Sequence, residues 1–359
     1  MKIGIRGIGV LGGFGCGRPA LAQALDTGHV PHRRVTINTA RGELEVPALL
    51  ADTSPLTDFI PRNALRRTDH YTRMALLGAH LALKDAGIAD AEKERMGIIV
   101  ATGYGSTCNT FDFQDLSEPE SELRFSPTRF SNSAHNAAAA HISVFLKING
   151  PNLSVNHFDM SIPSALLTAC GWLAEKRVAH VLVGGVDAFS NVMGYYRHRL
   201  ESLGETAGTG STSTVVIGEG CAFFLLTGEE NTPYGYIAQA TVGRFNGQPL
   251  SLPEDTLLFQ GIDGFGQHGV DYGRCISGPR YAAAYTPLYG CTPVGMAFDM
   301  AIAGISIETG TVSPPPLLPG KAVGLEPAFS PQPLSGRSIS CLKINDAGEF
   351  GMVTVSPRL

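Results

Sequence analysis

The sequence predicts an α/β protein, and three observations support that prediction. Apolar stretches typical of buried strands alternate along the chain with segments whose apolar residues recur at helical spacing. The composition, with 43% hydrophobic and 16% charged residues, is typical of a folded globular chain and not of a disordered one. At 359 residues the chain is longer than one hydrophobic core usually extends, so we expect two fused subdomains.

Charge and cysteine content exclude several classes of function. With 27 basic and 32 acidic residues, the net charge of -5 excludes a protein that binds nucleic acid electrostatically. The seven cysteines contain no C-x-x-C pair, so we expect reduced thiols and neither a disulfide framework nor a metal site. The first residues lack the apolar core of a signal peptide, and no apolar run reaches about 18 residues. We therefore expect a cytoplasmic protein without a membrane span or a cofactor.

The first segment predicts a strand, a turn and a helix. Residues 3–10 have a strand pattern, and a glycine-rich turn leads into a short helix at residues 19–25. Gly7, Gly9 and Gly12 fit the G-x-G-x-x-G pattern of dinucleotide-binding loops. The pattern lies partly inside the strand, and no acidic residue follows it at the required distance. We therefore interpret the glycines as positions of close packing.

A helix, a strand and a loop are expected next. Residues 66–87 predict an amphipathic helix with Thr68 or Asp69 as its N-cap and a glycine at its end. A buried strand is expected at residues 97–103. Residues 117–127 have loop composition, and they lie either near an interface or tunnel mouth or in an ordinary solvent loop.

The middle of the chain contains the most informative pattern. A helix is expected at residues 136–146, and a Gly-Pro pair then leads into a short strand at residues 153–156. A sharp elbow follows at residues 157–160. The next helix, expected at residues 163–175, is apolar on nearly every side and should be buried between layers. A fully apolar strand at residues 180–185 follows it.

The start of that buried helix offers several polar candidates. Pro163 suits the first helical turn, and either Ser161 or Asp159 could cap the helix. His157 lies close enough in sequence to suggest an activated Ser161 hydroxyl. No third group that would orient the histidine can be named, so a structural role for the serine is preferred.

Strands dominate the rest of the chain. Two strands are expected to pair with each other around the turn Gly218-Glu219-Gly220. Beyond Asn231 the segments YIAQATV, LLFQGID, SISCLKI and GMVTV each have a strand pattern.

The order of these elements resembles the β-ketoacyl synthases of the thiolase superfamily. The resemblance rests on a D-x-x-x-R helix that ends in DAG, on F-x-N-S-x-x-N, on the GP pair before a strand and an elbow, and on LVGGVDAFS and GEG. It implies a thiolase-like five-layer αβαβα fold made of two similar halves. These halves are residues 1–228 and a shortened second half, residues 229–359.

The resemblance also implies where the family's chemistry would lie. In the family, a cysteine at the elbow accepts an acyl chain, and two histidines of the second half bind a thioester carbonyl as negative charge develops. Here the residue that matches the cysteine is Asp159, and the nearest cysteine, Cys170, lies deep in the following helix. The first histidine position falls on Asp263. The second falls on Cys291 or Thr292, depending on where one gap is placed.

The composition of the second half indicates, without any alignment, that the family's catalytic residues are missing from it. His268 is the only histidine after Asn231, and no lysine occurs between Lys176 and Lys321. Two catalytic histidines and the nearby family lysine therefore cannot be assembled from this half. The terminal glycine motif of the family is also degraded and survives as GEFG.

The replacing residues are open to several interpretations. Asp159 could simply cap the helix. If Asp159 and Asp263 meet, repulsion would raise one pKa, and the pair could act as general acid and base in decarboxylation or thioester hydrolysis. His135 and His141 do not have metal-ligand spacing, so packing or surface positions are preferred. Cys291 is interpreted as a small buried filler.

The overall pattern resembles chain-length factors, which are catalytically silent subunits that pair with an active ketosynthase; aryl polyene biosynthesis is a narrower expectation. The resemblance implies a heterodimer joined along residues 153–156, and acyl carrier protein that is reached through the complex. The alternatives are a decarboxylase or thioesterase acting on malonyl or acyl carrier protein, and a scaffolding homodimer. Residues expected to line the interface or the partner's tunnel are Leu153, Ser154, Val155, Asn156, His157, Phe158 and Met160.

Overall fold

The computed structural model describes most of the chain. The described residues are 2–39, 42–115, 127–202, 215–252, 255–262, 281–316 and 330–358, together with Tyr272 and Ile276. Asp263, His268 and all but the last residue of the predicted loop at 117–127 lie outside them. Within the described part, no helix is both long enough and apolar enough to cross a bilayer.

The predicted strands and helices of the first part form, and the structure adds the strands β3 and β4 and the helices α3, α4 and α7, which the sequence analysis does not predict. The first part of the chain contains the main strands β1 (Gly4–Gly12), β5 (Met96–Thr102), β6 (Asn152–Asn156), β7 (His180–Asp187) and β9 (Gly220–Thr227). Its helices are α1 (Gly17–Thr27), α2 (His70–Asp85), α3 (Thr107–Asp115), α4 (Pro127–Ser133), α5 (Ala137–Leu146), α6 (Ser161–Ala174) and α7 (Asn191–Ser202). The remaining strands are β2 (Gly15–Cys16), β3 (Arg33–Thr39), β4 (Gly42–Leu49) and β8 (Ile217–Gly218).

Among its described residues, the second part of the chain contains the four predicted strands and three additional short strands, β12, β13 and β14. The main strands are β10 (Tyr236–Arg244), β11 (Leu257–Gln260), β12 (Ala282–Ala283), β15 (Ile339–Ile344) and β16 (Glu349–Ser356). The helices are α9 (Thr286–Tyr289) and α10 (Gly295–Thr309), and β13 (Thr311–Val312) pairs with β14 (Gln332–Pro333).

The strand order repeats itself in the two parts of the main sheet. The order along the sheet is β12-β11-β15-β16-β10-β1-β9-β7-β5-β6. From β1 outward, successive pairs are antiparallel, antiparallel, parallel and parallel, and the pairs from β10 outward follow the same order. The two parts are joined where Gly4 of β1 pairs with Tyr236 of β10. This repeat supports two similar halves, and the boundary at residue 228 stays a prediction.

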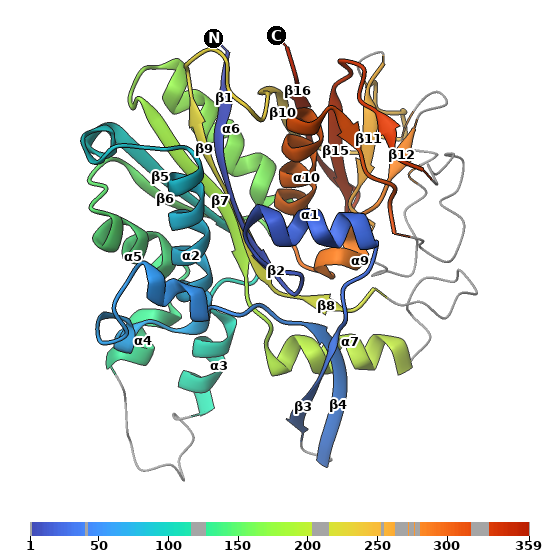
Figure 1. The fold of residues 1–359 in the computed structure, drawn as a ribbon. Helices are drawn as coiled ribbons and strands as arrows, with labels where there is room; N and C mark the ends of the chain where they lie inside the picture. The colour runs from blue at the N-terminus through green and yellow to red at the C-terminus, as the bar shows by residue number, and fades with distance from the viewer. Residues whose placement is uncertain are drawn as a thin grey trace.

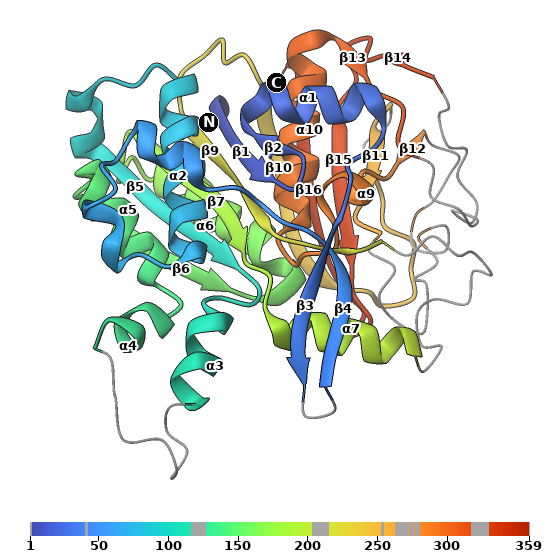
Figure 2. The same ribbon diagram turned by 60° about the horizontal axis from the view of Figure 1, so that its bottom comes forward.

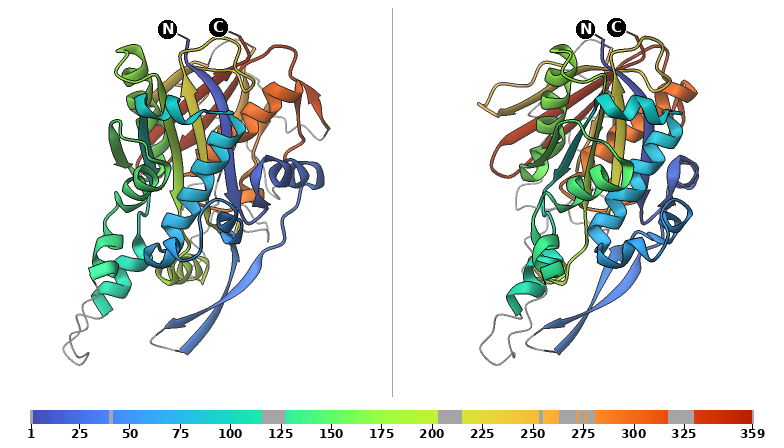
Figure 3. Two further views of the ribbon diagram at one scale, coloured as in Figure 1. Left: turned by 60° about the vertical axis from the view of Figure 1, so that its left-hand side comes forward. Right: turned by 90° about the vertical axis from the view of Figure 1, so that its left-hand side faces the viewer.

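Helices separate the two parts of the sheet and cover one outer face. α6 packs on β5 and β7 and also on β10 and β16, while α10 contacts β1 and β9 as well as β15 and β16. α2 packs on β1, β7 and β9, and α5 on β5 and β6 (Figure 1). One hydrophobic core therefore surrounds α6 and α10, and a second lies beneath α2 and α5. Figure 3 shows the helices and sheet from the side, with both termini at one end.

Close packing between β1 and α2 explains the glycines of the G-x-G-x-x-G pattern. A Cβ atom on Gly9 would lie 2.1 Å from the carbonyl oxygen of Gly78, and one on Gly7 would lie 2.3 Å from that of Ala82. A side chain at either position would collide with the backbone of α2, so the interpretation as packing glycines is confirmed. Asp69 caps α2, as predicted, because its side chain accepts a backbone N–H of the first turn.

One predicted strand pairing is wrong. β8 pairs with β4, and β9 pairs with β1 and β7, so the strands on either side of Glu219 do not pair with each other. Gly220 has a φ of 147°, and a Cβ there would lie 2.2 Å from the carbonyl oxygen of Leu11. A residue with a side chain would be strained in this conformation. Gly220 therefore allows the chain to pass from β8, which pairs with β4, to β9 in the main sheet. β3 and β4 form a hairpin that projects beside α7 (Figure 2).

Candidate active site

The elbow between β6 and α6 is a tight turn with an unusual backbone. Residues Phe158–Met160 form a short 3-10 helix, η4, and Phe158 has a φ of 43°, in the left-handed region that side chains rarely adopt. The N-cap of α6 is Met160, which makes no side-chain cap hydrogen bond. The prediction that Ser161 or Asp159 caps this helix is therefore wrong, because the turn of η4 places the N-cap between them.

Ser161 instead anchors the elbow to the neighbouring strand. Its Oγ accepts a hydrogen bond from the backbone N–H of His157 at 2.8 Å. The same hydroxyl lies 2.8 Å from the carbonyl oxygen of Thr102 and 2.7 Å from that of Phe158. A buried hydroxyl that is committed to backbone groups is not available as a nucleophile. The expected structural role of Ser161 is therefore confirmed, although the residue is an anchor and not a cap.

Asp159 stands at the position predicted for the thiol, and a lysine faces it. Its Oδ1 lies 3.7 Å from Nζ of Lys343 on β15, and the two side chains are 25% and 8% exposed. The Lys343 ammonium also donates to the carbonyl oxygen of Gly261 at 3.0 Å. The Lys343 ammonium therefore supplies a positive charge beside this carboxylate. Asp263, the other aspartate of the predicted pair, lies outside the described residues.

Cys170, deep in α6, and Cys291, before α10, are poorly suited to acyl transfer. Burial raises the pKa of Cys170, on α6, to about 11, which disfavours the reactive thiolate. Cys291 is buried, and its backbone is hydrogen-bonded to Val216 and Gly218, in agreement with the predicted filler role. Thr292 is also buried, and its Oγ1 has no hydrogen-bond partner.

Sequence reasoning misses a buried acid on α10. Asp299 is 1% exposed, and its Oδ1 accepts a hydrogen bond from the Tyr289 hydroxyl at 2.8 Å. Burial raises the pKa of Asp299 to about 7, while the Tyr289 hydrogen bond and the positive charge of Lys343 act in the opposite direction. A single acidic residue within the apolar segment GMAFDMAIAG is the signal that indicates such a site.

A second buried acid, Asp187, joins strand ends next to the elbow. Its carboxylate accepts hydrogen bonds from Thr102 Oγ1 at 2.6 Å, the Gly103 N–H at 3.1 Å and the Tyr104 N–H at 2.9 Å. Burial raises the pKa of Asp187 to about 6 in spite of these hydrogen bonds. A Cβ on Gly103 would lie 2.2 Å from Cβ of Pro293. Asp187 therefore holds a loop against the segment that precedes α10.

The residues predicted to face a partner lie at the end of the main sheet where, among the described residues, no further strand pairs. β6 pairs with β5 on one side and is the last strand in the sheet order. Met160 differs from the expectation, because it is fully buried and lies beside Gly351 of its own chain. The remaining predicted residues are exposed or half-buried: Leu153, Ser154, Val155, Asn156, His157 and Phe158. Val144 of α5 and Leu167 of α6 are exposed apolar residues on the adjoining helices.

His157 lies between a serine and a carboxylate. Its Nδ1 is 3.1 Å from Oγ of Ser164, in the first part of α6. Its Nε2 is 3.9 Å from Oε1 of Glu349, at the start of β16. The serine beside the His157 ring is therefore Ser164 and not the Ser161 considered from the sequence, and the carboxylate nearest the ring is Glu349 of the degraded GEFG motif.

The histidines near α5 have the packing and surface positions that the sequence predicts. His141 stacks on Phe145, and burial lowers the pKa of its imidazole. His135 is exposed and lies beside Gly105. Among the described residues, neither histidine belongs to a group of potential metal ligands.

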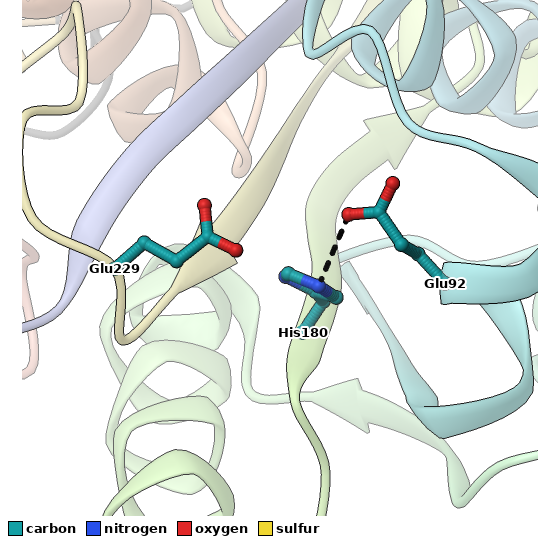
Figure 4. Close-up of side chains that lie close together, drawn as sticks. All are labelled: Glu92, His180 and Glu229. Atoms are coloured by element: carbon teal, nitrogen blue, oxygen red, sulfur yellow. Dashed lines mark ion pairs between the residues drawn. The ribbon is translucent and has the colours of Figure 1, made fainter.

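One group of three potential metal ligands lies at the opposite end of β7. Glu92, His180 and Glu229 converge there, and Nε2 of His180 is 3.6 Å from Oε1 of Glu92 (Figure 4). Nη1 of Arg6, however, lies 2.8 Å from Glu92 and 3.5 Å from Glu229. The guanidinium already supplies positive charge to both carboxylates, so we interpret the group as an ion-pair network.

Comparison with known sequences shows what the chain is similar to. Residues 21–231, more than half of the chain, match the model of the β-ketoacyl synthase N-terminal domain. Over 170 residues the chain is 28% identical to 3-oxoacyl-(acyl-carrier-protein) synthase 2 of Rhizobium meliloti (strain 1021), covering 43% of this chain and 39% of that protein. Over 203 residues it is 27% identical to putative polyketide beta-ketoacyl synthase 1 of Streptomyces cyaneus, covering 52% and 46%. The chain thus spans less than half the length of these curated relatives.

Solved structures match nearly the whole chain. The ishigamide ketosynthase/chain length factor has a TM-score of 0.72 at 16% identity and covers 99% of both chains. A β-ketoacyl synthase from Burkholderia phymatum STM815 has a TM-score of 0.77 at 16% identity, again over 99% of both. A type II PKS acyl-carrier protein in complex with its ketosynthase has a TM-score of 0.76 at 14% identity, over 99% and 98%. These matches confirm the predicted thiolase-like α/β fold.

Proposed function

Because the chain belongs to the β-ketoacyl synthase family, we propose that it is a ketosynthase-like subunit that does not condense acyl chains itself and that pairs with an active ketosynthase, as a chain-length factor does. The observation that carries this proposal is Asp159 at the elbow, paired with Lys343, where the family's chemistry needs a thiolate. An acyl group on that carboxylate would be a reactive mixed anhydride, which is unsuited to holding a growing chain.

The free edge of the main sheet supports the proposed pairing. An exposed edge strand presents unpaired N–H and C=O groups, and a second chain can cover them. Exposed apolar side chains on β6, η4 and α6, namely Leu153, Phe158 and Leu167, lie on elements that contact one another. Antiparallel pairing of β6 with its counterpart would make the two main sheets continuous. His157 and Phe158 would then reach the partner's acyl tunnel and limit its length.

The finer assignments follow from the same role. The proposed substrates are acyl chains of a polyketide or fatty-acid-like pathway, with aryl polyene biosynthesis as the narrower assignment, and acyl carrier protein reaches the complex through the partner. The chain would comprise two halves, residues 1–228 and 229–359. A cytoplasmic location, where thiols stay reduced, is part of the same proposal. The role requires no cofactor.

The alternative of acid–base chemistry by two aspartates has less support. A general acid or base that works near neutral pH needs a raised carboxyl pKa. Asp159 instead has a lysine 3.7 Å away, the arrangement of a structural ion pair.

Co-expression with the ketosynthase encoded nearby tests the proposal. We expect a heterodimer by native mass spectrometry, and acylation of the partner's cysteine by intact-mass analysis after incubation with acyl-carrier-protein substrate. Leu153→Asp on β6 should abolish the heterodimer, whereas Val192→Asp on α7, a similarly exposed position, should leave it intact. A homodimer that does not bind the ketosynthase would favour the alternative of a scaffolding homodimer. Chain elongation by this subunit alone, or an acyl group on Asp159, would overturn the proposal.

A further inference from the structure

We infer that Ser164, His157 and Glu349 form a hydrolytic site for acyl thioesters beside the degenerate elbow. The site goes beyond the proposed function, which concerns pairing and the loss of condensation. It is separate from Asp159, whose carboxylate faces Lys343. Only the thioester class of the substrate rests on the proposed function.

The spacing of the three side chains suits a nucleophile, a base and an orienting carboxylate. Ser164 Oγ lies 3.1 Å from Nδ1 of His157, within hydrogen-bond reach. Glu349 Oε1 lies 3.9 Å from Nε2 of the same ring, a distance that a small closure on substrate binding would convert into a hydrogen bond. The three residues come from the first part of α6, the elbow and the start of β16.

Asn345 orients the carboxylate. Its Nδ2 donates to Oε2 of Glu349 at 2.9 Å, and its Oδ1 accepts the Glu349 backbone N–H at 2.9 Å. These two bonds leave the other carboxylate oxygen facing His157. A negative charge next to Nε2 favours the tautomer with a proton on that nitrogen. The lone pair of Nδ1 is then available to accept the proton of Ser164.

The surroundings suit an acyl group. A serine in a helix commonly bonds a carbonyl oxygen of the preceding turn, but the bond that the structure gives to Ser164 Oγ is with His157. Leu167 lies three residues further along the same helical face and is 47% exposed, and Phe158 is 62% exposed. In the unpaired chain, these apolar side chains offer contact area for an alkyl chain. The positive end of α6 favours negative charge on the attacked carbonyl.

The reaction balances with water as the only co-reactant. Ser164 Oγ bonds to the thioester carbonyl carbon while His157 takes the hydroxyl proton. The carbon–sulfur bond then breaks, and His157 gives the proton to the leaving thiolate. Water attacks the acyl-serine ester, His157 takes a water proton and returns it to Ser164, and a carboxylic acid is released.

Hydrolysis of S-octanoyl-N-acetylcysteamine by the full chain, alone and in the heterodimer, tests this inference. We expect thiol release that falls at least about 100-fold in Ser164→Ala and about 10-fold in Glu349→Gln. Thr168→Ala, one turn further along α6, is the matched control and should keep the wild-type rate. A fluorophosphonate should label wild-type protein at Ser164, as mapped by peptide mass.

Two results would overturn the inference: thiol release that is unchanged in Ser164→Ala, or a wild-type protein that neither releases thiol nor takes up the label. Circular dichroism and native mass of the Ser164→Ala complex show whether the variant still folds and pairs. Heterodimer formation does not depend on Ser164, so the proposed function and this inference can fail separately.

Discussion

The two central helices occupy matching places in the repeated strand order, yet they start in opposite surroundings. α6 follows β6 through an elbow that exposes His157 and Phe158, whereas α10 is buried at every residue from Gly295 to Ser306. Chemistry on a substrate or contact with a partner requires an accessible surface. The comparison therefore indicates that the start of α10 is part of the core, while the elbow at the start of α6 is accessible to a substrate or a partner.

Truncating one side chain on each helix should give the largest difference in the free energy of unfolding. Phe298 on α10 is fully buried and stacks on Tyr289, with ring centroids 4.9 Å apart. Phe298→Ala should lower the free energy of unfolding by about 3–5 kcal/mol, because a large buried ring leaves a cavity. Leu167→Ala on the exposed face of α6 should cost less than about 0.5 kcal/mol. Urea unfolding of both variants checks this, and equal midpoints would contradict the comparison.

Substitution of Lys343 tests whether the structure around the elbow depends on the buried positive charge of this residue. Lys343→Met removes the partner of Asp159 and the donor to Gly261, so we expect a loss of about 2–3 kcal/mol. Asp159→Asn should cost about 1 kcal/mol or less, because that side chain is partly exposed and its replacement is neutral. Urea unfolding at pH 7 measures both. A larger loss for Asp159→Asn than for Lys343→Met would show that the carboxylate, and not the lysine, stabilises the structure around the elbow.

The buried acid of α10 should make stability depend on pH. The pKa of Asp299 is about 7 in the folded chain, above the value of about 3.9 in an unfolded one, so folding favours the protonated form. Its contribution is fully present below about pH 4 and is lost as pH rises toward 7. Relative to Asp299→Asn, the wild type should lose roughly 1–3 kcal/mol over this range. Parallel curves of unfolding free energy against pH would contradict this expectation.

Local patterns were sufficient to predict much of the fold. The Asp69 cap, the packing glycines of β1 and the apolar helix at α6 all depend on residues close in sequence, and each agrees with the structure. The pairing of β8 was mispredicted because its partner, β4, lies far upstream. Alternation along a strand identifies the strand but not its neighbour.

The polar contacts of the site are harder to predict for the same reason. Lys343 and Glu349 belong to β15 and β16, which the sheet brings beside an elbow nearly two hundred residues earlier in the chain. The lysine within SISCLKI and the acid within GEFG interrupt apolar or glycine-rich motifs, which could have marked them as candidates. Their partners depend on the register of the sheet, which the sequence pattern does not specify.

Removing one hydroxyl at the start of each helix should give the smallest changes in stability, and we expect the two changes to have opposite signs. Ser161→Ala leaves the backbone N–H of His157 without its acceptor, so we expect a loss of about 1–2 kcal/mol. Thr292→Val replaces a buried hydroxyl that has no partner by a methyl group of similar shape, so stability should stay constant or rise by up to about 1 kcal/mol. Thermal unfolding of the two variants under one condition measures both signs. A clear loss of stability in Thr292→Val would mean that this hydroxyl contacts water or a ligand at the start of α10. The start of α10 would then not be the water-free core that the comparison with α6 assumes.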